Sequence, residues 1–211
     1  MLKVKICGVT RAADALLAAA EGADYIGLIF APSPRRVESR TAQEIVRQLP
    51  RGVEPVGVFL DQPIDEVRRV LEITGIRIAQ LHGRETPEYC RRLGVQVIKT
   101  FDTFSEDSLE RLKAYDAFAY LLDVPKGAGG RSRIDPDWAR LAKRHGRVIL
   151  AGRLTPENVG DLVARVRPFG VDACSATEKA PGVKDPARLR DFIRAAREAH
   201  RQSTRIKVRL R

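Results

Sequence analysis

Side chains that could transfer protons or bind anions stand directly after several short apolar runs of the chain. A thiol, a carboxylic acid and an imidazole can take part in acid–base chemistry, and arginines bind carboxylates and phosphates. Loops that expose backbone N–H groups can bind phosphate. The candidates are Cys7, Asp123, His82, Arg35, Arg36, Gly152, Arg153, Ser175 and Ala176. The set does not resemble a metal cage or a redox-cofactor site, so we expect neither a metal nor a cofactor.

The apolar runs alternate with longer stretches that have the residue spacing of helices. The runs predicted as strands span residues 3–7, 25–30, 54–60, 76–81, 95–100, 117–123, 147–151 and 170–174. The helices that follow are expected to begin near residues 11, 41, 63, 86, 105, 135, 155 and 185. Eight strand–helix units in about 200 residues predict an α/β protein, a single-domain (β/α)8 TIM barrel over residues 1–199, rather than an open doubly wound sheet. Such barrels carry their chemistry at the C-terminal ends of the strands, where the candidates stand.

Composition indicates a folded, soluble protein. The 211 residues are 44% hydrophobic and 31% charged, which argues against intrinsic disorder, and no apolar run approaches the roughly 18 residues of a membrane span. The first residues do not resemble a secretory signal, so we expect a cytoplasmic protein without a membrane partner. The three cysteines are too few for a disulfide framework and are expected to be free, with Cys90 and Cys174 as packing residues.

The net charge of +11 raises the question of a nucleic-acid partner. Part of the excess positive charge lies in the C-terminal segment 200–211. Residues 201–211 of this segment include five Arg or Lys and no Asp or Glu. The rest of the chain mixes both signs, so we expect no nucleic-acid binding. The segment is predicted to be a disordered basic tail, and its alternation of apolar Ile206, Val208 and Leu210 with basic residues leaves an edge strand or an acidic partner as alternatives.

Motifs at the ends of most predicted strands occur in an order that resembles the phosphoribosylanthranilate isomerases, barrel enzymes of tryptophan biosynthesis. The motifs are 5–10 (KICGVT), 29–35 (IFAPSPR), 56–59 (VGVF), 80–83 (QLHG), 122–123 (LD), 156–159 (PENV) and 181–185 (PGVKD). The resemblance covers residues 2 to about 197. It implies an Amadori rearrangement in which N-(5-phosphoribosyl)anthranilate becomes 1-(o-carboxyphenylamino)-1-deoxyribulose 5-phosphate without a cofactor. The partner is then a small phosphorylated substrate, and we expect a monomer or a homodimer.

The resemblance implies that Asp123 is the general acid and Cys7 the general base. Ring opening needs a proton on the furanose oxygen, and the resulting Schiff base must lose a proton from C2′ of the sugar. We therefore expect the pKa of Cys7 to be lowered by nearby positive charge or hydrogen-bond donors, and the pKa of Asp123 to be raised by burial. Without the resemblance, Cys7 could be a small buried hydrophobe and Asp123 could cap the next helix.

Further residues are assigned to substrate binding. The aromatic carboxylate implied by the resemblance needs a planar bidentate donor, which is either Arg35 or Arg36, with Arg35 favoured. His82 is expected to line the pocket and to orient the substrate, with a purely structural histidine as the alternative. Gln80 and Asp172 are candidates for supporting the site without touching the reaction.

The substrate phosphate is expected at the loops Gly152-Arg153 and Ser175-Ala176. Members of the family usually carry a Gly pair and a Ser-Gly pair there, and Ala176 lacks the freedom of glycine to adopt a positive φ. The glycine-rich stretch 126–133 also departs from the family pattern and is interpreted as a lid rather than a nucleotide-binding loop. These departures concern phosphate affinity and leave a second hypothesis, a related phosphosugar-binding barrel with a changed substrate or reduced activity.

Overall fold

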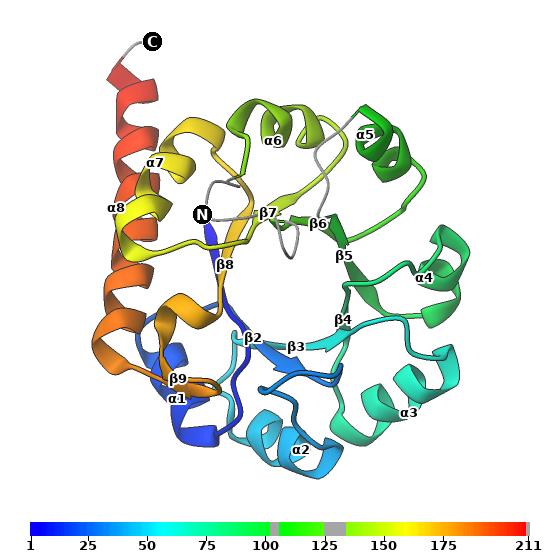
Figure 1. The fold of residues 1–211 in the computed structure, drawn as a ribbon. Helices are drawn as coiled ribbons and strands as arrows, with labels where there is room; N and C mark the ends of the chain where they lie inside the picture. Colours follow the sequence, from blue (N-terminus) through cyan, green and yellow to red (C-terminus); the bar gives the residue numbers. More distant parts are fainter. Residues whose placement is uncertain (102–105, 125–133, 210–211) are drawn as a thin grey trace.

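A computed structural model describes residues 1–101, 106–124 and 134–209 and contains a closed barrel of eight parallel strands (Figure 1). The strands are β1 (Lys3–Ile6), β2 (Tyr25–Ile29), β3 (Glu54–Phe59), β4 (Ile78–Leu81), β5 (Gln96–Phe101), β6 (Ala119–Leu122), β7 (Val148–Leu150) and β8 (Gly170–Ala173). The helices are α1 (Ala12–Ala20), α2 (Ser39–Gln48), α3 (Ile64–Thr74), α4 (Pro87–Leu93), α5 (Glu106–Lys113), α6 (Pro136–Ala142), α7 (Pro156–Val166) and α8 (Pro186–Arg209). The predicted (β/α)8 barrel is confirmed, with strand ends within two residues of the expected positions.

The barrel closes through the pairing of β8 with β1. Ile6 is aligned with Ala173, and the N–H of Cys7 donates to the carbonyl oxygen of Ala173 at 2.8 Å. The residues that follow these two strands, Cys7 and Cys174, therefore leave the barrel side by side. Closure thus joins the first and last units of the chain at one edge of the barrel mouth.

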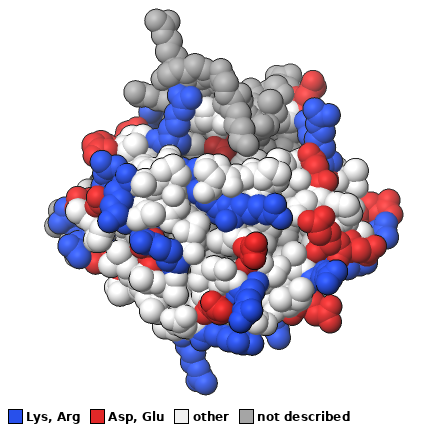
Figure 2. Space-filling view, turned by 60° about the horizontal axis from the view of Figure 1, so that its bottom comes forward, with Lys and Arg blue, Asp and Glu red and all other residues white. Residues whose placement is uncertain are grey.

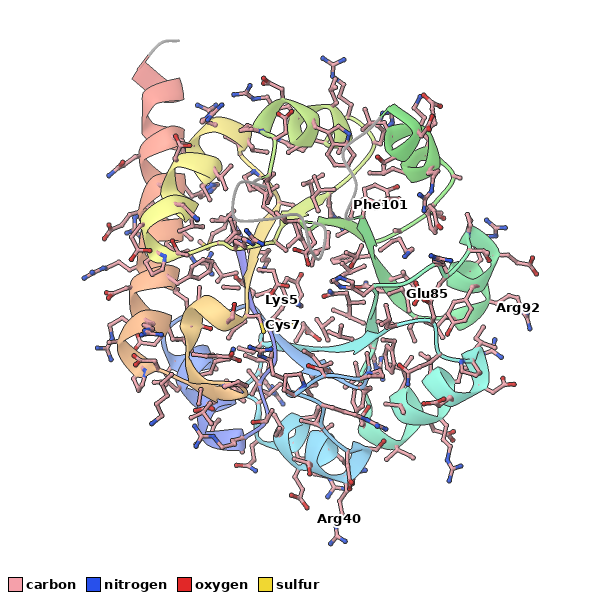
Figure 3. The ribbon with its side chains drawn as sticks, viewed as in Figure 1. Lys5, Cys7, Arg40, Glu85, Arg92 and Phe101 are labelled. Atoms are coloured by element: carbon pink, nitrogen blue, oxygen red, sulfur yellow. The ribbon has the colours of Figure 1, made fainter. Side chains whose placement is uncertain are left out.

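Alternating side chains of the strands divide the core into two layers. One layer fills the inside of the barrel and comprises Tyr25, Val56, Ile78, Ile98, Ala119, Leu121, Ile149 and Ala151. The other layer lies between the strands and the helices that surround them. Figure 3 shows Lys5 and Cys7 inside the ring of strands, whereas Arg40 on α2 and Arg92 on α4 point outward. The barrel wall therefore places polar side chains of the strands within an otherwise apolar interior.

A short irregular segment follows β8. It consists of the 3-10 helix η1 (Ser175–Thr177) and an antiparallel hairpin of β9 (Glu178–Ala180) and β10 (Val183–Lys184). The hairpin lies against the β1–α1 connection, where the hydroxyl of Thr10 donates to the carbonyl oxygen of Gly182 at 2.6 Å. The sequence did not predict this hairpin, because strands of two and three residues carry no usable periodicity.

The sequence predicts a disordered tail over 200–211, whereas the described part of this segment, up to residue 209, is helical. Helix α8 continues to Arg209 and extends past α7 beyond the ring of the barrel (Figure 1). Arg, Gln and Lys are good helix formers, and Ser203 is buried with its hydroxyl donating to the carbonyl oxygen of His200 at 2.9 Å. The segment therefore extends an existing packed helix, and it forms no edge strand up to Arg209.

Charges of both signs are interspersed on the face of the molecule that Figure 2 displays. Lys and Arg side chains alternate there with Asp and Glu and with uncharged surface, without a continuous basic stripe. Within the ranges that the structure describes, no helix is both long enough and apolar enough to span a membrane.

Candidate active site

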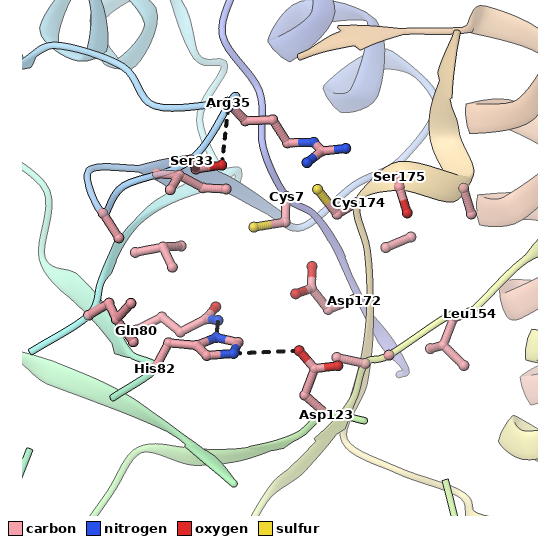
Figure 4. Close-up of a pocket in the computed structure, with 18 of the residues that line it drawn as sticks. Cys7, Ser33, Arg35, Gln80, His82, Asp123, Leu154, Asp172, Cys174 and Ser175 are labelled. Carbon is pink, nitrogen blue, oxygen red and sulfur yellow. Dashed lines mark hydrogen bonds and ion pairs between the residues drawn. The ribbon is translucent and has the colours of Figure 1, made fainter. Parts of the chain in front are cut away.

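A pocket of about 480 Å³ opens at the C-terminal ends of the strands (Figure 4). Its polar lining comprises Cys7, Ser33, Arg35, Gln80, His82, Asp123, Arg153, Asp172, Cys174 and Ser175, together with Gly152 and Ala176. Eight of the nine predicted site residues thus meet in one cavity. The exception is Arg36, which is exposed and does not line this pocket.

Cys7 stands directly after β1 and is 6% exposed. The pKa of its thiol is lowered to about 7, chiefly by a hydrogen bond from the Cys174 thiol. Burial opposes this shift, whereas the nearby ammonium groups of Lys5 and Lys184 favour the thiolate. Space beside the sulfur is tight, because a Cβ at Gly27 would lie 2.7 Å from it. The lowered pKa has the direction that the sequence predicts for a general base.

The cation beside Cys7 is itself held by an ion pair. The Nζ atom of Lys5 lies 2.8 Å from Oδ2 of Asp172, and both side chains are buried. Burial alone would lower the pKa of Lys5, but the charge of Asp172 and the neighbouring Cys7 sulfur outweigh it, so the pKa is raised and the ammonium stays charged. The second carboxylate oxygen of Asp172 makes no hydrogen bond with the described residues.

Asp123 follows β6 and faces the same pocket. Its backbone N–H donates to the carbonyl oxygen of Phe101, and its Oδ1 accepts from the N–H of Val124 at 2.7 Å. Burial raises the pKa of the carboxyl group, and the hydrogen bond from Val124 only partly offsets this. The direction matches that predicted for a general acid.

His82 approaches Asp123 from the end of β4. Its Nε2 lies 3.7 Å from Oδ2 of Asp123, and its Nδ1 lies 3.5 Å from the amide nitrogen of Gln80 (Figure 4). The imidazole therefore sits between a buried amide and the candidate acid, in a position to orient that acid or the substrate. The Oε1 atom of Gln80 is buried and has no hydrogen-bond partner among the described residues.

Arg35 reaches the pocket from the loop after β2. Its side chain passes over Gly8, where a Cβ would lie 2.6 Å from Cδ of the arginine, and Gly8 has a φ of +69°. The guanidinium forms a bidentate ion pair with Glu178 of β9. Glycine at position 8 is therefore needed for both its backbone conformation and the passage of the arginine.

The loops after β7 and β8 also line the pocket. Gly152 has a φ of +72°, and a Cβ there would lie 2.6 Å from the nitrogen of Val124. Arg153 adopts a φ of +55°, a conformation that costs a non-glycine residue energy. Ala176 is not among the described residues with a positive φ, so the freedom of glycine is not needed there. The stretch 126–133, interpreted as a lid, lies outside the described residues.

Comparison with known proteins identifies the family. The chain matches the family N-(5'-phosphoribosyl)anthranilate (PRA) isomerase over residues 4–195. The N-(5'-phosphoribosyl)anthranilate isomerase of Pelobacter propionicus is 42% identical over 209 residues, which are 97% of this chain and 100% of the relative. The chain belongs to this family. A second relative of the same name, from Geotalea uraniireducens, is 44% identical over 93% of this chain and 99% of its own length.

Solved structures of phosphoribosylanthranilate isomerases have the same fold. The enzyme from Thermotoga maritima superposes with a TM-score of 0.88 at 36% identity, covering 94% of this chain and 100% of that one. The enzyme from Thermus thermophilus gives 0.85 at 40% identity, covering 93% and 99%. A further isomerase structure, with a TM-score of 0.85 at 35% identity, contains reduced 1-(o-carboxyphenylamino)-1-deoxyribulose 5-phosphate. Family membership confirms the predicted isomerase of tryptophan biosynthesis.

Three residues at this site of the isomerase barrel were not assigned a function from the sequence. Cys174 was interpreted as packing, and it also lowers the pKa of Cys7. Glu178 binds the Arg35 guanidinium, and Lys184 donates to the carbonyl oxygen of Cys7. The pairing of β8 with β1, which a closed barrel requires, was the signal that could have placed Cys174 beside Cys7. Glu178 follows the eighth predicted strand, at the mouth of the barrel, but its contact with Arg35 depends on the hairpin, which was not predicted. Within the described ranges no cluster of His, Cys, Asp and Glu has the geometry of a metal site.

Proposed function

We propose that the chain catalyses the Amadori rearrangement of N-(5-phosphoribosyl)anthranilate with Cys7 as general base and Asp123 as general acid. The observation that carries this proposal is the presence of both groups in one pocket with pKa shifts of opposite sign. A thiolate and a neutral carboxylic acid are the protonation states that proton removal and proton delivery require.

Ring opening is the first step. Protonated Asp123 delivers its proton to the furanose oxygen, the bond between this oxygen and C1′ breaks, and the nitrogen lone pair forms the C=N bond of a Schiff base. The carboxylate that remains is stabilised by the N–H of Val124, which already donates to Oδ1. His82, at 3.7 Å, is placed to interact with the same carboxylate.

Proton removal from C2′ is the second step. The Cys7 thiolate takes this proton, and the electron pair of the broken C–H bond forms the C1′–C2′ double bond of an enolamine and neutralises the iminium nitrogen. Loss of the C2′ hydroxyl proton and protonation at C1′ then give the ketone. C2′ is oxidised and C1′ is reduced within the same molecule, so the step consumes no oxidant or reductant.

Arg35 would bind the aromatic carboxylate, because it lines the pocket and its planar guanidinium suits a bidentate contact, whereas Arg36 is exposed. The phosphate would bind at Gly152, Arg153 and the N-terminus of the segment that begins at Ser175, which all line the same pocket. Binding of the carboxylate and the phosphate would hold the sugar, which connects them, within reach of the acid and the base.

We further propose that the enzyme works in the cytoplasm as a monomer or a homodimer. In support, one solved relative, with 36% identity, is described as monomers generated from the dimeric isomerase of Thermotoga maritima, so both states occur for a protein of this fold. Light scattering coupled to gel filtration will distinguish a 23.5 kDa species from one of twice that mass.

Turnover measurements test the assignment of acid and base. The substrate is generated from anthranilate and phosphoribosyl pyrophosphate, and its fluorescence is followed for the native chain, Cys7→Ser and Asp123→Asn. We expect both variants to fall by roughly 10²- to 10⁴-fold in kcat, and the control Cys90→Ser, whose thiol is buried on α4, to keep native activity. An inactive native chain would favour a changed substrate, and an unchanged Asp123→Asn would remove Asp123 from the mechanism.

A further inference from the structure

Glu178 forms a bidentate contact with Arg35, one of the two arginines that line the pocket. Oε1 and Oε2 of Glu178 lie 2.9 and 3.0 Å from Nε of Arg35, and Oε2 lies 2.7 Å from Nη2. The glutamate side chain is 4% exposed and that of the arginine 20%. This is a largely buried, bidentate contact, which fixes the direction of the guanidinium as well as its place.

The carboxylate of Glu178 is also held by two residues of its own hairpin. Its Oε1 accepts from Nζ of Lys184 at 3.1 Å and from the N–H of Gly182 at 3.3 Å. Nζ of Lys184 also donates to the carbonyl oxygens of Cys7 at 2.6 Å and Cys174 at 3.1 Å. The support for the arginine is therefore anchored to the backbone that carries the two thiols.

The contact leaves one end of the guanidinium available. Glu178 occupies Nε and one N–H of Nη2, while Nη1 makes no hydrogen bond with any residue of the described ranges. The two N–H groups of Nη1 and the second of Nη2 form the end that a carboxylate can bind in bidentate fashion. Arg35, Lys184 and Glu178 together carry a net charge of +1, which favours binding of one anionic group.

We propose that Glu178 is a positioning residue that holds Arg35 by its Nε–Nη2 edge and aims the Nη1–Nη2 end at the aromatic carboxylate of the substrate. The proposal rests on the function proposed above, in which Arg35 binds that carboxylate. Without Glu178, the long arginine side chain must be ordered during binding, and this cost appears in substrate affinity.

A pair of substrates that differ in the carboxylate alone tests this role. Ribose 5-phosphate condenses with anthranilate to give the carboxylated substrate and with aniline to give its counterpart without the carboxylate. kcat and KM for both are measured with the native chain, Glu178→Ala, Glu178→Gln and Arg35→Ala. For each protein, the ratio of the two kcat/KM values measures how much the substrate carboxylate contributes to kcat/KM.

We expect the native chain to prefer the carboxylated substrate by roughly ten- to a hundredfold, and Arg35→Ala to have a preference near one. Glu178→Ala should reduce the native preference by roughly three- to tenfold, the cost of ordering one long side chain, and mainly through KM. A purely structural glutamate would lower kcat/KM for both substrates equally and leave the ratio unchanged, which would overturn the proposal.

The arginine variant separates the two proposals. If Arg35→Ala keeps the native preference, Arg35 does not bind the carboxylate and that part of the proposed function fails. If Arg35→Ala loses the preference while Glu178→Ala and Glu178→Gln keep it, only the role of Glu178 fails. Glu178→Gln preserves the volume of the side chain should the alanine variant not fold, and titration with reduced 1-(o-carboxyphenylamino)-1-deoxyribulose 5-phosphate gives affinity independently of turnover.

Discussion

The thiol of Cys7 lies among groups that favour its ionised form. The neighbouring Cys174 thiol lowers the pKa of Cys7, and so does the ammonium group of Lys5, which Asp172 fixes nearby. A donor hydrogen bond to a thiolate stabilises the charged form without adding a net charge to the pocket. The pKa values of the two thiols shift in opposite directions, because the pKa of Cys174 is raised by its interaction with Cys7 and by burial.

Cys174→Ala is therefore expected to raise the pKa of Cys7 from about 7 toward the ordinary value of 9.0. A thiolate reacts with iodoacetamide and a thiol does not, so the rate of alkylation should rise with pH through an inflection near 7 in the native chain and at a higher pH in the variant. Cys90 adds little to this signal, because burial raises its pKa to about 11.

Cys174→Ser is the matched control, because its hydroxyl can still donate to Cys7. Its inflection should stay closer to that of the native chain than the inflection of Cys174→Ala does. Equal inflections in all three proteins would mean that the hydrogen bond does not set the pKa of Cys7 and that the lysines dominate.

At the scale of the elements, the loop between β7 and α7 carries a strained residue. Arg153 has a φ of +55°, and its carbonyl oxygen accepts from Nδ2 of Asn158 at 2.9 Å. The Oδ1 atom of the same asparagine accepts from the N–H of Thr155, so the side chain ties the loop to the first turn of the helix. The loop keeps its shape although an arginine occupies a left-handed position.

Arg153→Gly is expected to stabilise the fold by about 1 kcal/mol, because glycine adopts a positive φ without steric cost. For a protein of this size, that change corresponds to a rise of roughly 2–4 °C in Tm. Arg153→Ala loses the same side chain but keeps the Cβ, so it should not gain this stability. A Tm of the alanine variant equal to that of the glycine variant would show that backbone strain at position 153 is not the cause.

The elements could be predicted from the sequence where they are long and regular. Each of the eight strand–helix units repeats a buried run and an amphipathic stretch, so their order and approximate bounds follow from periodicity. The hairpin at Glu178–Lys184 and the continuation of α8 to Arg209 do not follow from it. The hairpin depends on contacts with the β1–α1 connection, and the helix end depends on packing that composition does not reveal.

For the whole molecule, closure of the barrel gathers residues that are far apart in the chain. Cys7 and Asp123 could be predicted to share a pocket, because every strand of a barrel ends at the same face. The effect of Cys174 on the pKa of Cys7 and the support of Arg35 by Glu178 could not be predicted in the same way. They depend on rotamers and on distances across the mouth, which only the folded molecule defines.

The central claim is that one particular thiol, Cys7, removes the proton from C2′. The most direct test is the single-turnover rate of Cys7→Ser beside that of Cys174→Ser, because the two sulfurs are neighbours in one pocket and each variant changes a single atom. We predict a fall of roughly 10²- to 10⁴-fold for Cys7→Ser and of less than about tenfold for Cys174→Ser. Equal rates for the two variants, or a larger fall for Cys174→Ser, would contradict the assignment of Cys7 as the base.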